Sequence, residues 1–485
     1  MEIKRRRHKG ISAAFQLKKA AESDMMNVEK DMKSETTEIK LFSNRDLKKL
    51  IMPLVVEQFL AIAVGLVDSI MVSIAGEAAV SGVSLVDSVF ILIITVFTAL
   101  ASGGAVIAGR FIGQKRSEKG NDAVDQLVIF ILLLSVAVTV LVYVCKPFIL
   151  NVVFGNIDSE VMHNCNVYLM ITAASIPFIA LYNAAAALFR AMNDSKTSMK
   201  VSIMMNLVHI AGNAVLLYGL GWGVEGVAVP TLFSRILAAV VMIVLLGNQK
   251  RLIHFTKPFK FRLQKKMLKD MLYIGVPNSL ENSMFQLGKI VILSFVSGMG
   301  TSAIAANAIG NSICMVAVIP GMAMGYALLA VASQCVGAGD FEQVKYYTKK
   351  IIKWEYGVII AFNVVIVACL PLIMKLYHLS AGTGELACKL IIMHAVMACL
   401  IWPISFTVPN TLRASSDVMY PMIWSIISMW VFRVICARIL GGWFGLGVMG
   451  VWIAMFIDWA FRTVMFSHRY KKGKWQYKVK RRSDG

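Results

Sequence analysis

Charged residues are scarce in this sequence, and the motifs of soluble enzymes are missing from it. Of its 485 residues, 16% are charged and 58% are hydrophobic. A soluble protein of this length would divide into several domains with a larger charged fraction. No P-loop, no GxGxxG motif after a strand, no Ser/His/Asp set and no metal-ligand cluster occurs in a polar segment. We therefore expect neither an enzyme nor a protein with a cofactor.

Cysteine-based sites are missing as well. The eight cysteines include no CxxC pair and no Cys/His spacing typical of a metal site. Most of them lie in apolar runs, where a free thiol behaves as a small hydrophobe. The basic N-terminus MEIKRRRHKG is not followed by a short apolar core, so we expect no cleavable signal peptide.

What the sequence does contain is long apolar runs. Runs of about 20 residues or more recur along most of the chain, which is typical of a multi-pass membrane protein. We expect an all-α membrane protein whose twelve transmembrane helices form two six-helix lobes. The predicted spans are residues 50–74, 83–107, 124–148, 167–188, 197–219, 225–247, 270–298, 303–330, 351–376, 387–410, 418–440 and 446–467. The predicted segments are a mobile basic cytoplasmic tail (1–45), an N-terminal lobe (46–247), a cytoplasmic linker (248–269), a C-terminal lobe (270–468) and a second basic cytoplasmic tail (469–485).

The net charge of +21 is distributed in a way that fits a membrane protein. Lysine and arginine gather in the two tails and in alternate loops, as the positive-inside rule predicts. We therefore expect a multi-pass protein of the cell (inner) membrane with both termini in the cytoplasm. Basic stripes with interleaved aromatic residues are absent from any globular stretch, so we expect no nucleic-acid partner. The expected partners are a small-molecule substrate and membrane lipid, and we expect a monomer.

The two predicted lobes are related by an internal repeat. Pro53 and Glu57 recur as Pro277 and Glu281, an offset of 224 residues. The same or a nearly identical offset relates Gly76 to Gly300, Gly113 to Gly337, GVEGV at 223–227 to GVMGV at 447–451, and Arg190, Ala191 and Asp194 to Arg413, Ala414 and Asp417. Repeats of six helices share one topology, which is the design of transporters that bind substrate between two lobes and alternate access.

The first predicted span carries acidic groups into the membrane. Glu57 and Asp68 are eleven residues apart, so they share one helix face and lie about 16 Å apart along its axis. A carboxylate in hydrocarbon is costly and normally marks an ion or substrate path. The alternative is a pair of buried carboxylates fixed by neighbouring helices. Glu57 has a counterpart in the second half, whereas the offset places Ile292 opposite Asp68, so Asp68 is the stronger candidate for carrying an ion.

A series of short motifs runs in order along the chain. They are Pro53…Glu57-Gln58 with Val67-Asp68-Ser69-Ile70-Met71, Gly76, Gly113-Gln114, Leu188-Phe189-Arg190-Ala191 with Asp194, and Gly223-Val-Glu-Gly-Val-Ala-Val-Pro-Thr231. In these motifs the chain resembles the MATE (multidrug and toxic compound extrusion) family over residues 45–470. The resemblance implies a secondary active multidrug efflux antiporter that exports amphipathic, often cationic, organic compounds in exchange for H⁺ or Na⁺.

Two other functions are compared with this one. The MATE family belongs to a larger group that also contains flippases for lipid-linked oligosaccharides, and such a flippase is the alternative. Such a flippase would have a basic cavity that attracts phosphate. Lys289 is the one residue in the sequence that supports a cavity of this kind. A membrane receptor or scaffold that transports nothing is disfavoured by the repeat and by the acidic groups within the predicted spans.

Four residues match the cation-coupling site that the resemblance implies. Asp68 matches the first-helix aspartate that binds the coupling ion, and His209, Asn213 and Thr231 match polar residues of the fifth and sixth helices. His209 stands where the family commonly has Asn, and it adds a group that titrates near neutral pH, which favours protons over a simple Na⁺ cage. Na⁺ at Asp68 stays open, and so does a purely structural role for Asp68 or for His209.

A second group of polar residues is expected to line the substrate cavity. This group is Glu57, Gln58, Asn206, Glu281, Gln286 and Lys289. Lys289 lies too deep in the seventh span to reach water by snorkelling, so it should face the cavity. It could pair with Asp68 or Glu281 across the cleft, lose its proton in one state, or form a permanent ion pair that closes one face of the cleft.

Charged residues also occur at the predicted cytoplasmic helix ends. Arg190, Asp194, Arg413 and Asp417 are expected to close a cytoplasmic gate through ion pairs. Arg433 and Asp458 are further charges within or near predicted spans, and the sequence does not define their positions.

Overall fold

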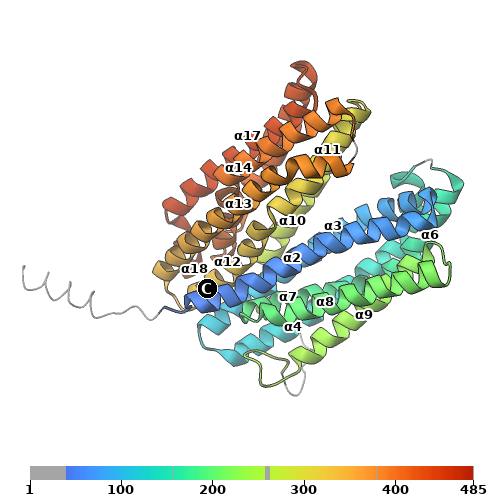
Figure 1. Ribbon diagram of the computed structural model, residues 1–485. Coiled ribbons are helices and arrows are strands. Elements are labelled where there is room, and N and C mark those ends of the chain that lie inside the picture. Colours follow the sequence, from blue (N-terminus) through green and yellow to red (C-terminus); the bar gives the residue numbers. More distant parts are fainter. Residues whose placement is uncertain (1–39, 156, 257–260, 262, 378, 484–485) are drawn as a thin grey trace, which may run out of the picture. The chain divides into compact units, whose positions relative to one another are not determined.

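The computed structural model describes residues 40–155, 157–256, 261, 263–377 and 379–483. From Asn44 onward these residues form one unit, in which every described regular element is a helix (Figure 1). Most of the predicted tail 1–45 and part of the predicted linker 248–269 lie outside the described residues.

The N-terminal half contains the first six predicted spans. They are α2 (Asn44–Val72), α3 (Glu77–Gly113), α4 (Ser117–Val144), the pair α6 (Ser159–Ala173) and α7 (Ile176–Ala191), α8 (Ser195–Asn213) with η3 (Ala214–Gly219), and α9 (Glu225–Leu246). Short segments continue two of these spans, namely η1 (Ser73–Ala75) after α2, and α5 (Lys146–Phe148) and η2 (Ile149–Val153) after α4.

The C-terminal half contains the other six predicted spans. They are α10 (Lys265–Ser297), the pair α11 (Thr301–Ala317) and α12 (Ile319–Gly337), α13 (Phe341–Tyr377), α14 (Ala381–Ala414), the series α15 (Met419–Ile427), η4 (Ser428–Ile435), α16 (Cys436–Arg438) and η5 (Ile439–Trp443), and α17 (Gly447–Lys471). A terminal helix, α18 (Lys474–Ser483), lies in the segment predicted to be a tail.

Two spans are interrupted, and in each of them a proline lies directly after the break. The axes of α6 and α7 differ by 50°, and Pro177 lies in the first turn of α7. Pro320 likewise lies in the first turn of α12, directly after the break that follows α11. Proline lacks a backbone N–H, so the first helical turn accommodates it while the preceding helix ends.

The internal repeat is visible in the backbone. Gly76 and Gly300, which precede α3 and α11, both have positive φ angles, of 99° and 92°. Asn193 and Ser416, which follow α7 and α14, have φ angles of 62° and 61°. Positive φ is uncommon for residues other than glycine, so its recurrence at equivalent positions shows that the two halves use the same turns.

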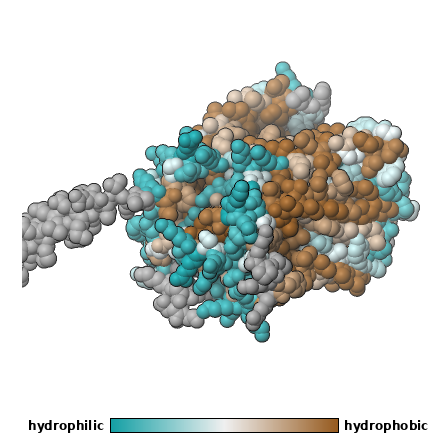
Figure 2. Space-filling view, turned by 90° about the horizontal axis from the view of Figure 1, so that it is seen from below, coloured by the Kyte–Doolittle hydropathy of each residue, from teal (hydrophilic) through white to brown (hydrophobic). Residues whose placement is uncertain are grey.

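Most of these helices can cross a membrane by length and composition. Within the described residues, ten helices satisfy both conditions, and the bent pair α6–α7 raises the number to eleven. α10 is not among them, although it has 33 residues and corresponds to a predicted span. Its apolar sequence is interrupted by polar residues, of which Glu281, Asn282, Gln286 and Lys289 line the cavity described below. Figure 2 shows a broad hydrophobic surface on the viewed face, with hydrophilic residues gathered at the end where α2 begins.

The two halves contact each other at this hydrophilic end. The Arg110 guanidinium donates to the Ala414 carbonyl oxygen at 2.6 Å, and the Gln334 amide donates to the Ala191 carbonyl oxygen at 2.6 Å. A Cβ added at Gly113 would lie 2.0 Å from the backbone oxygen of Gln334, so this approach requires glycine. Away from this end the helices of the two halves diverge (Figure 1).

Candidate functional site

Four polar side chains meet inside the N-terminal half. His209 Nε2 lies 2.8 Å from Asp68 Oδ1, and the Asn213 amide donates to the same oxygen at 2.6 Å. Thr231 Oγ1 lies 3.5 Å from the other ring nitrogen, His209 Nδ1. The structure therefore brings together all four residues that were predicted to form the coupling site.

Helix geometry explains how α8 and α9 present these groups. His209 and Asn213 are one turn apart on α8, so they point to the same side. α8 changes to the π-helical segment η3 directly after Asn213, and such segments are frequent at functional sites. A Cβ added at Gly212 would lie 2.7 Å from the Pro230 side chain, so glycine allows α9 to approach closely. This approach places Thr231 beside the imidazole.

The cluster is mostly shielded from water but not closed. Asp68 and His209 keep 24% and 10% of their side-chain surface exposed, whereas Asn213 is fully buried. The side-chain oxygen of Asn213 is buried and has no hydrogen-bond partner among the described residues. The exposed part of the carboxylate can accept a proton, and carboxylate, amide and hydroxyl oxygens are also the ligands that a hard cation such as Na⁺ prefers. No group of three or more metal-ligating His, Cys, Asp or Glu side chains occurs in the described residues.

A second acidic group lies near this cluster and was not predicted. Asp87 of α3 accepts a hydrogen bond from the Tyr168 hydroxyl at 3.2 Å. Asp68, His209 and Arg235 are close enough to interact with it electrostatically. Arg235 of α9 donates to Ser175 Oγ at 2.7 Å. Asp87 and Arg235 are charges within apolar predicted spans, so the rule that singled out Asp68 could also have found them.

The two repeat-related glutamates each contact an arginine of their own half. Glu57 lies 3.6 Å from Arg190 and accepts from Ser198 Oγ at 2.9 Å. Glu281 lies 2.7 Å from Arg413. Both carboxylates are buried, so the equivalent pairs tie α2 to α7 and α10 to α14.

In the described residues, the four residues predicted to form a cytoplasmic gate form ion pairs with other partners and not with one another. Arg190 and Arg413 bind the glutamates, whereas Asp194 forms an ion pair with Arg251 and accepts from the Thr197 backbone N–H at the start of α8. Asp417 accepts two hydrogen bonds from Arg469, at 2.6 and 2.9 Å. Asp194 thus connects the start of α8 to Arg251 of the linker, and Asp417, which lies shortly before α15, binds Arg469 of α17.

The C-terminal half contains a cavity of about 450 Å³. Three residues predicted to line the substrate cavity, Glu281, Gln286 and Lys289, line it from α10. Glu57, Gln58 and Asn206 do not line it, and Gln58 and Asn206 are half-buried. Lys289 forms no ion pair with Asp68 or Glu281 in the described residues, so this conformation realises neither of the two predicted pairings.

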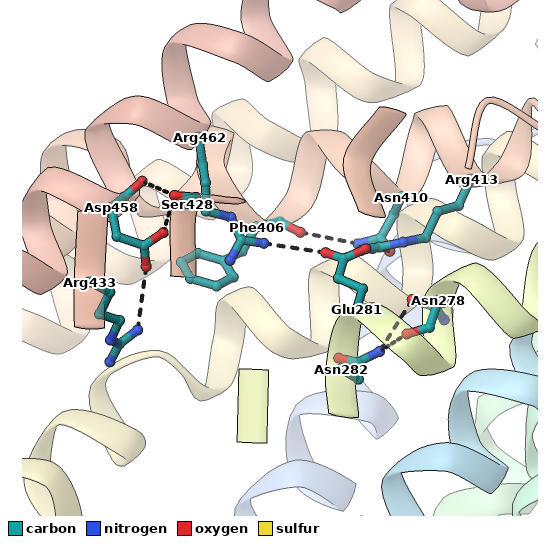
Figure 3. A network of polar contacts seen from close by, with 10 residues as sticks. All are labelled: Asn278, Glu281, Asn282, Phe406, Asn410, Arg413, Ser428, Arg433, Asp458 and Arg462. Atoms are coloured by element: carbon teal, nitrogen blue, oxygen red, sulfur yellow. Dashed lines mark hydrogen bonds and ion pairs between the residues drawn. The ribbon is translucent and has the colours of Figure 1, made fainter. Parts of the chain in front are cut away.

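Three arginines that line this cavity were not predicted to do so, namely Arg413, which was predicted for the cytoplasmic gate, and Arg433 and Arg462. Arg462 of α17 lies 3.5 Å from Glu281, and Arg433 of η4 lies 3.5 Å from Asp458 (Figure 3). Asp458 is fully buried and also accepts a hydrogen bond from Ser428. Because η4 is π-helical, the ordinary spacing of 100° per residue does not predict the side to which Arg433 points.

Comparison with known proteins identifies the family. The MatE family model matches residues 53–215 and again residues 277–439, so the two matches repeat the offset of 224 residues. The chain belongs to the MatE family. The predicted resemblance and the predicted all-α, two-lobed fold are thereby confirmed.

Individual relatives of this MatE protein agree with the assignment. It is similar to the uncharacterized transporter YisQ of Bacillus subtilis, with 25% identity over 88% of this chain and 94% of that protein. It is also similar to the probable multidrug resistance protein YoeA of the same organism, with 28% identity over 78% of this chain and 82% of that protein. A solved structure described as the outward-facing conformation of a multidrug resistance MATE family transporter shares the fold. Its TM-score is 0.82, at 21% identity over 90% of this chain and 96% of that one.

These findings assign the chain to a class. It is a multi-pass membrane transporter of the MATE multidrug resistance family. MATE proteins are transporters and, as a family, not enzymes.

Proposed function

We propose that this protein is a secondary active antiporter of the cell (inner) membrane that exports amphipathic organic compounds in exchange for H⁺ or Na⁺. The observation that carries the proposal is the contact of Asp68 with His209 and Asn213. A carboxylate inside a membrane protein normally marks an ion or substrate path. The two side chains position one carboxylate oxygen and leave the group partly accessible.

The asymmetry of the repeat supports coupling in the N-terminal half. Ile292 occupies the position equivalent to Asp68, so the second half lacks the acidic group. Glu57 and Glu281, by contrast, occur in both halves and bind arginine in both. We assign the two glutamates to the shared architecture and Asp68 to ion binding.

His209 favours the proton as the coupling ion. Its ring nitrogen occupies one side of the Asp68 carboxylate, where a Na⁺ cage would need an oxygen ligand. Imidazole is the side chain that ordinarily changes charge near neutral pH. Na⁺ is the alternative, with ligands from Asp68, the buried side-chain oxygen of Asn213 and Thr231.

The arrangement of the halves suggests the direction of access. The hydrogen bonds of Arg110 and Gln334 join the halves at the hydrophilic end, where the basic residues follow the positive-inside rule. We place this end and both termini in the cytoplasm, so that the described conformation opens to the outside. Alternation would break these contacts and close the opposite end, and a monomer suffices for this motion.

The experiment that tests the proposal is transport by the purified protein in lipid vesicles. Efflux of an amphipathic dye is measured under an imposed ΔpH or ΔNa⁺, for the wild type, for Asp68→Asn, and for Glu160→Gln as an exposed carboxylate control. We expect the wild type and the control to use one of the two gradients, and Asp68→Asn to lose gradient-driven efflux. Equal efflux by Asp68→Asn would remove the coupling assignment.

A flippase for a lipid-linked oligosaccharide is the second candidate, and one observation favours it. The cavity in the C-terminal half is basic, because Arg433 and Arg462 line it together with Lys289. A lipid-linked pyrophosphate would suit such a wall. Transport of a fluorescent polyprenyl pyrophosphate in the same vesicles, without dye efflux under either gradient, would select this candidate.

A further inference from the structure

The cavity in the C-terminal half is not explained by ion coupling. α10, α11, α12, α14, η4 and α17 contribute its walls, and Thr95 of α3 is the contribution of the N-terminal half. Its volume of about 450 Å³ lies within the range typical of sites for small organic molecules.

The charges that line this cavity are mostly positive. The cations are Lys289, Arg413, Arg433 and Arg462, and the carboxylate among the lining residues is Glu281. Asp458 lies behind Arg433 and is fully buried. With both carboxylates included, two positive charges remain in excess in the described wall. Charges of one sign with low-dielectric walls concentrate ligands of the opposite sign.

The carboxylates are already engaged. Glu281 is shared by two guanidinium groups, Arg413 at 2.7 Å and Arg462 at 3.5 Å. Asp458 lies 3.5 Å from Arg433 and also accepts from Ser428 (Figure 3). No carboxylate of the described residues pairs with Lys289, and the charged group that acts on it is Arg433. Two cations on one cavity repel each other unless an anion lies near both.

Two hydrogen-bond donors of the wall are unpaired. The buried Arg462 Nε and Trp459 Nε1 atoms have no hydrogen-bond partner among the described residues. Buried polar groups in folded proteins almost always have partners, so unpaired ones need an explanation. Both residues line the cavity. A ligand that brings acceptor oxygens would match a wall that is rich in donors.

Aromatic rings complete the wall and hold the guanidinium groups. The Arg433 guanidinium lies 5.2 Å from the centre of the Phe285 ring, and that of Arg462 lies 4.6 Å from the centre of the Phe406 ring. Trp402 stacks on Phe406 with ring centres 4.9 Å apart. The cavity therefore combines cationic groups with a flat apolar surface.

We propose that this cavity binds an amphipathic organic anion. Lys289 and Arg433 hold its carboxylate or phosphate group, and its apolar or aromatic body lies against Trp402, Phe406 and Trp459. The inference rests on the proposed export function and specifies the substrate class. Ion coupling and substrate binding then use sites of opposite charge, acidic at Asp68 in the N-terminal half and basic in the C-terminal half.

Three probes with one aromatic body and different charge test the proposal. They are 2-naphthoate, 2-naphthamide and 2-naphthylmethylammonium, and their binding to the full-length protein in phosphatidylcholine nanodiscs is measured by equilibrium dialysis without any gradient. We expect naphthoate to bind most tightly. Lys289→Gln should weaken naphthoate about tenfold or more and leave naphthamide unchanged, because a charge-assisted contact is lost.

Two control variants separate this result from other effects. Lys389→Gln removes a lysine that is exposed and paired with Glu385, so naphthoate affinity should stay at the wild-type value. Glu160→Gln, at an exposed carboxylate of the N-terminal half, should also bind naphthoate normally, because the probe site lies in the other half. Binding therefore tests the anion site, whereas gradient-driven efflux tests the coupling, and either can fail alone.

Several results would overturn the proposal. Equal or tighter binding of the ammonium probe would do so, as would an unchanged naphthoate affinity in a monodisperse Lys289→Gln protein, or no binding of any probe. Competition by a polyprenyl phosphate at far lower concentrations than by free naphthoate would support the anion site and identify its ligand as a lipid. Without such competition, the ligand of the anion site is a small organic acid and not a lipid.

Discussion

His209 Nε2 lies 2.8 Å from Asp68 Oδ1, and this contact joins α8 to α2. The imidazole and the carboxylate form one hydrogen-bonded unit, so loss of the ring would also change the hydrogen bonding of the carboxylate. The first prediction concerns this pair.

Replacement of His209 by Asn should flatten the pH dependence of transport. Asn keeps a hydrogen-bond donor for Asp68 but lacks a ring nitrogen that can take up or release a proton, as an imidazole can. We expect ΔpH-driven efflux by the wild type to vary with pH, and efflux by the variant to respond less to pH. The measurement is the initial efflux rate in vesicles clamped at a series of pH values. His163→Asn changes an exposed histidine and should keep the wild-type profile; a wild-type profile in His209→Asn itself would make that residue structural.

The two repeat-related glutamates should differ in their contribution to stability. Glu281→Gln leaves Arg413 and Arg462 without their shared carboxylate, and breaking a buried ion pair costs about 3–5 kcal/mol. Glu57→Gln affects one arginine, at the longer distance of 3.6 Å. We expect a larger fall in melting temperature for Glu281→Gln in the purified protein. Glu342→Gln, at an exposed pair, should have no measurable effect. An equal or larger fall for Glu57→Gln would contradict the prediction.

Alanine at Gly113 should separate the two halves at the hydrophilic end. The added Cβ would lie 2.0 Å from the Gln334 backbone oxygen, which cannot move without shifting α12. Spin labels at positions 118 and 342, in a background without the native cysteines, report the distance between the halves. We expect a longer distance and at least a tenfold loss of efflux. Gly357→Ala has open space around its Cβ and serves as the control; unchanged distances in Gly113→Ala would show that this contact does not hold the end closed.

Reversal of the charge at position 289 should change substrate preference. Lys289→Glu balances the cations and carboxylates of the cavity in the C-terminal half. We expect the ratio of cationic to anionic dye efflux to rise, measured as initial rates in the same vesicles. Lys389→Glu, on an exposed helix surface, should leave that ratio as it is. A ratio that stays constant in Lys289→Glu would mean that the cavity does not select substrates by charge.

Much of the fold could be predicted from the sequence because hydropathy and the repeat agree. Each predicted span corresponds to a helix or to a pair or series of short helices. α10 is less apolar than its neighbours, so hydropathy alone identifies it poorly. The repeat identifies it as a span, because Pro277 and Glu281 repeat Pro53 and Glu57. The added helix α18 was not predicted, because its polar and basic sequence produces no new apolar run.

The candidate site was predicted less completely, for a physical reason. Asp68, His209 and Asn213 could be placed together because the resemblance specifies them and because α8 is regular up to Asn213. The partners of Arg190 and Arg413 could not, since long side chains can reach several carboxylates and the sequence does not show which helices adjoin. Arg433 lies in a π-helical segment, where the usual helical spacing fails.

The polar character of α10 has a consequence for how the protein is made. A lysine at the centre of a span raises the cost of membrane insertion by about 2.5–3.5 kcal/mol, and α10 also carries Asn278, Glu281, Asn282 and Gln286. Side chains of α10 donate to α3, from Asn278 to Ser102 Oγ at 2.9 Å and from Ser279 to the Val96 carbonyl oxygen at 3.1 Å. Since α3 is synthesised first, the N-terminal half is already in the bilayer when α10 emerges from the ribosome. We therefore expect the first half of the chain to assist the insertion of the helix that carries the cavity lysine, and a C-terminal half expressed alone to insert this helix less efficiently.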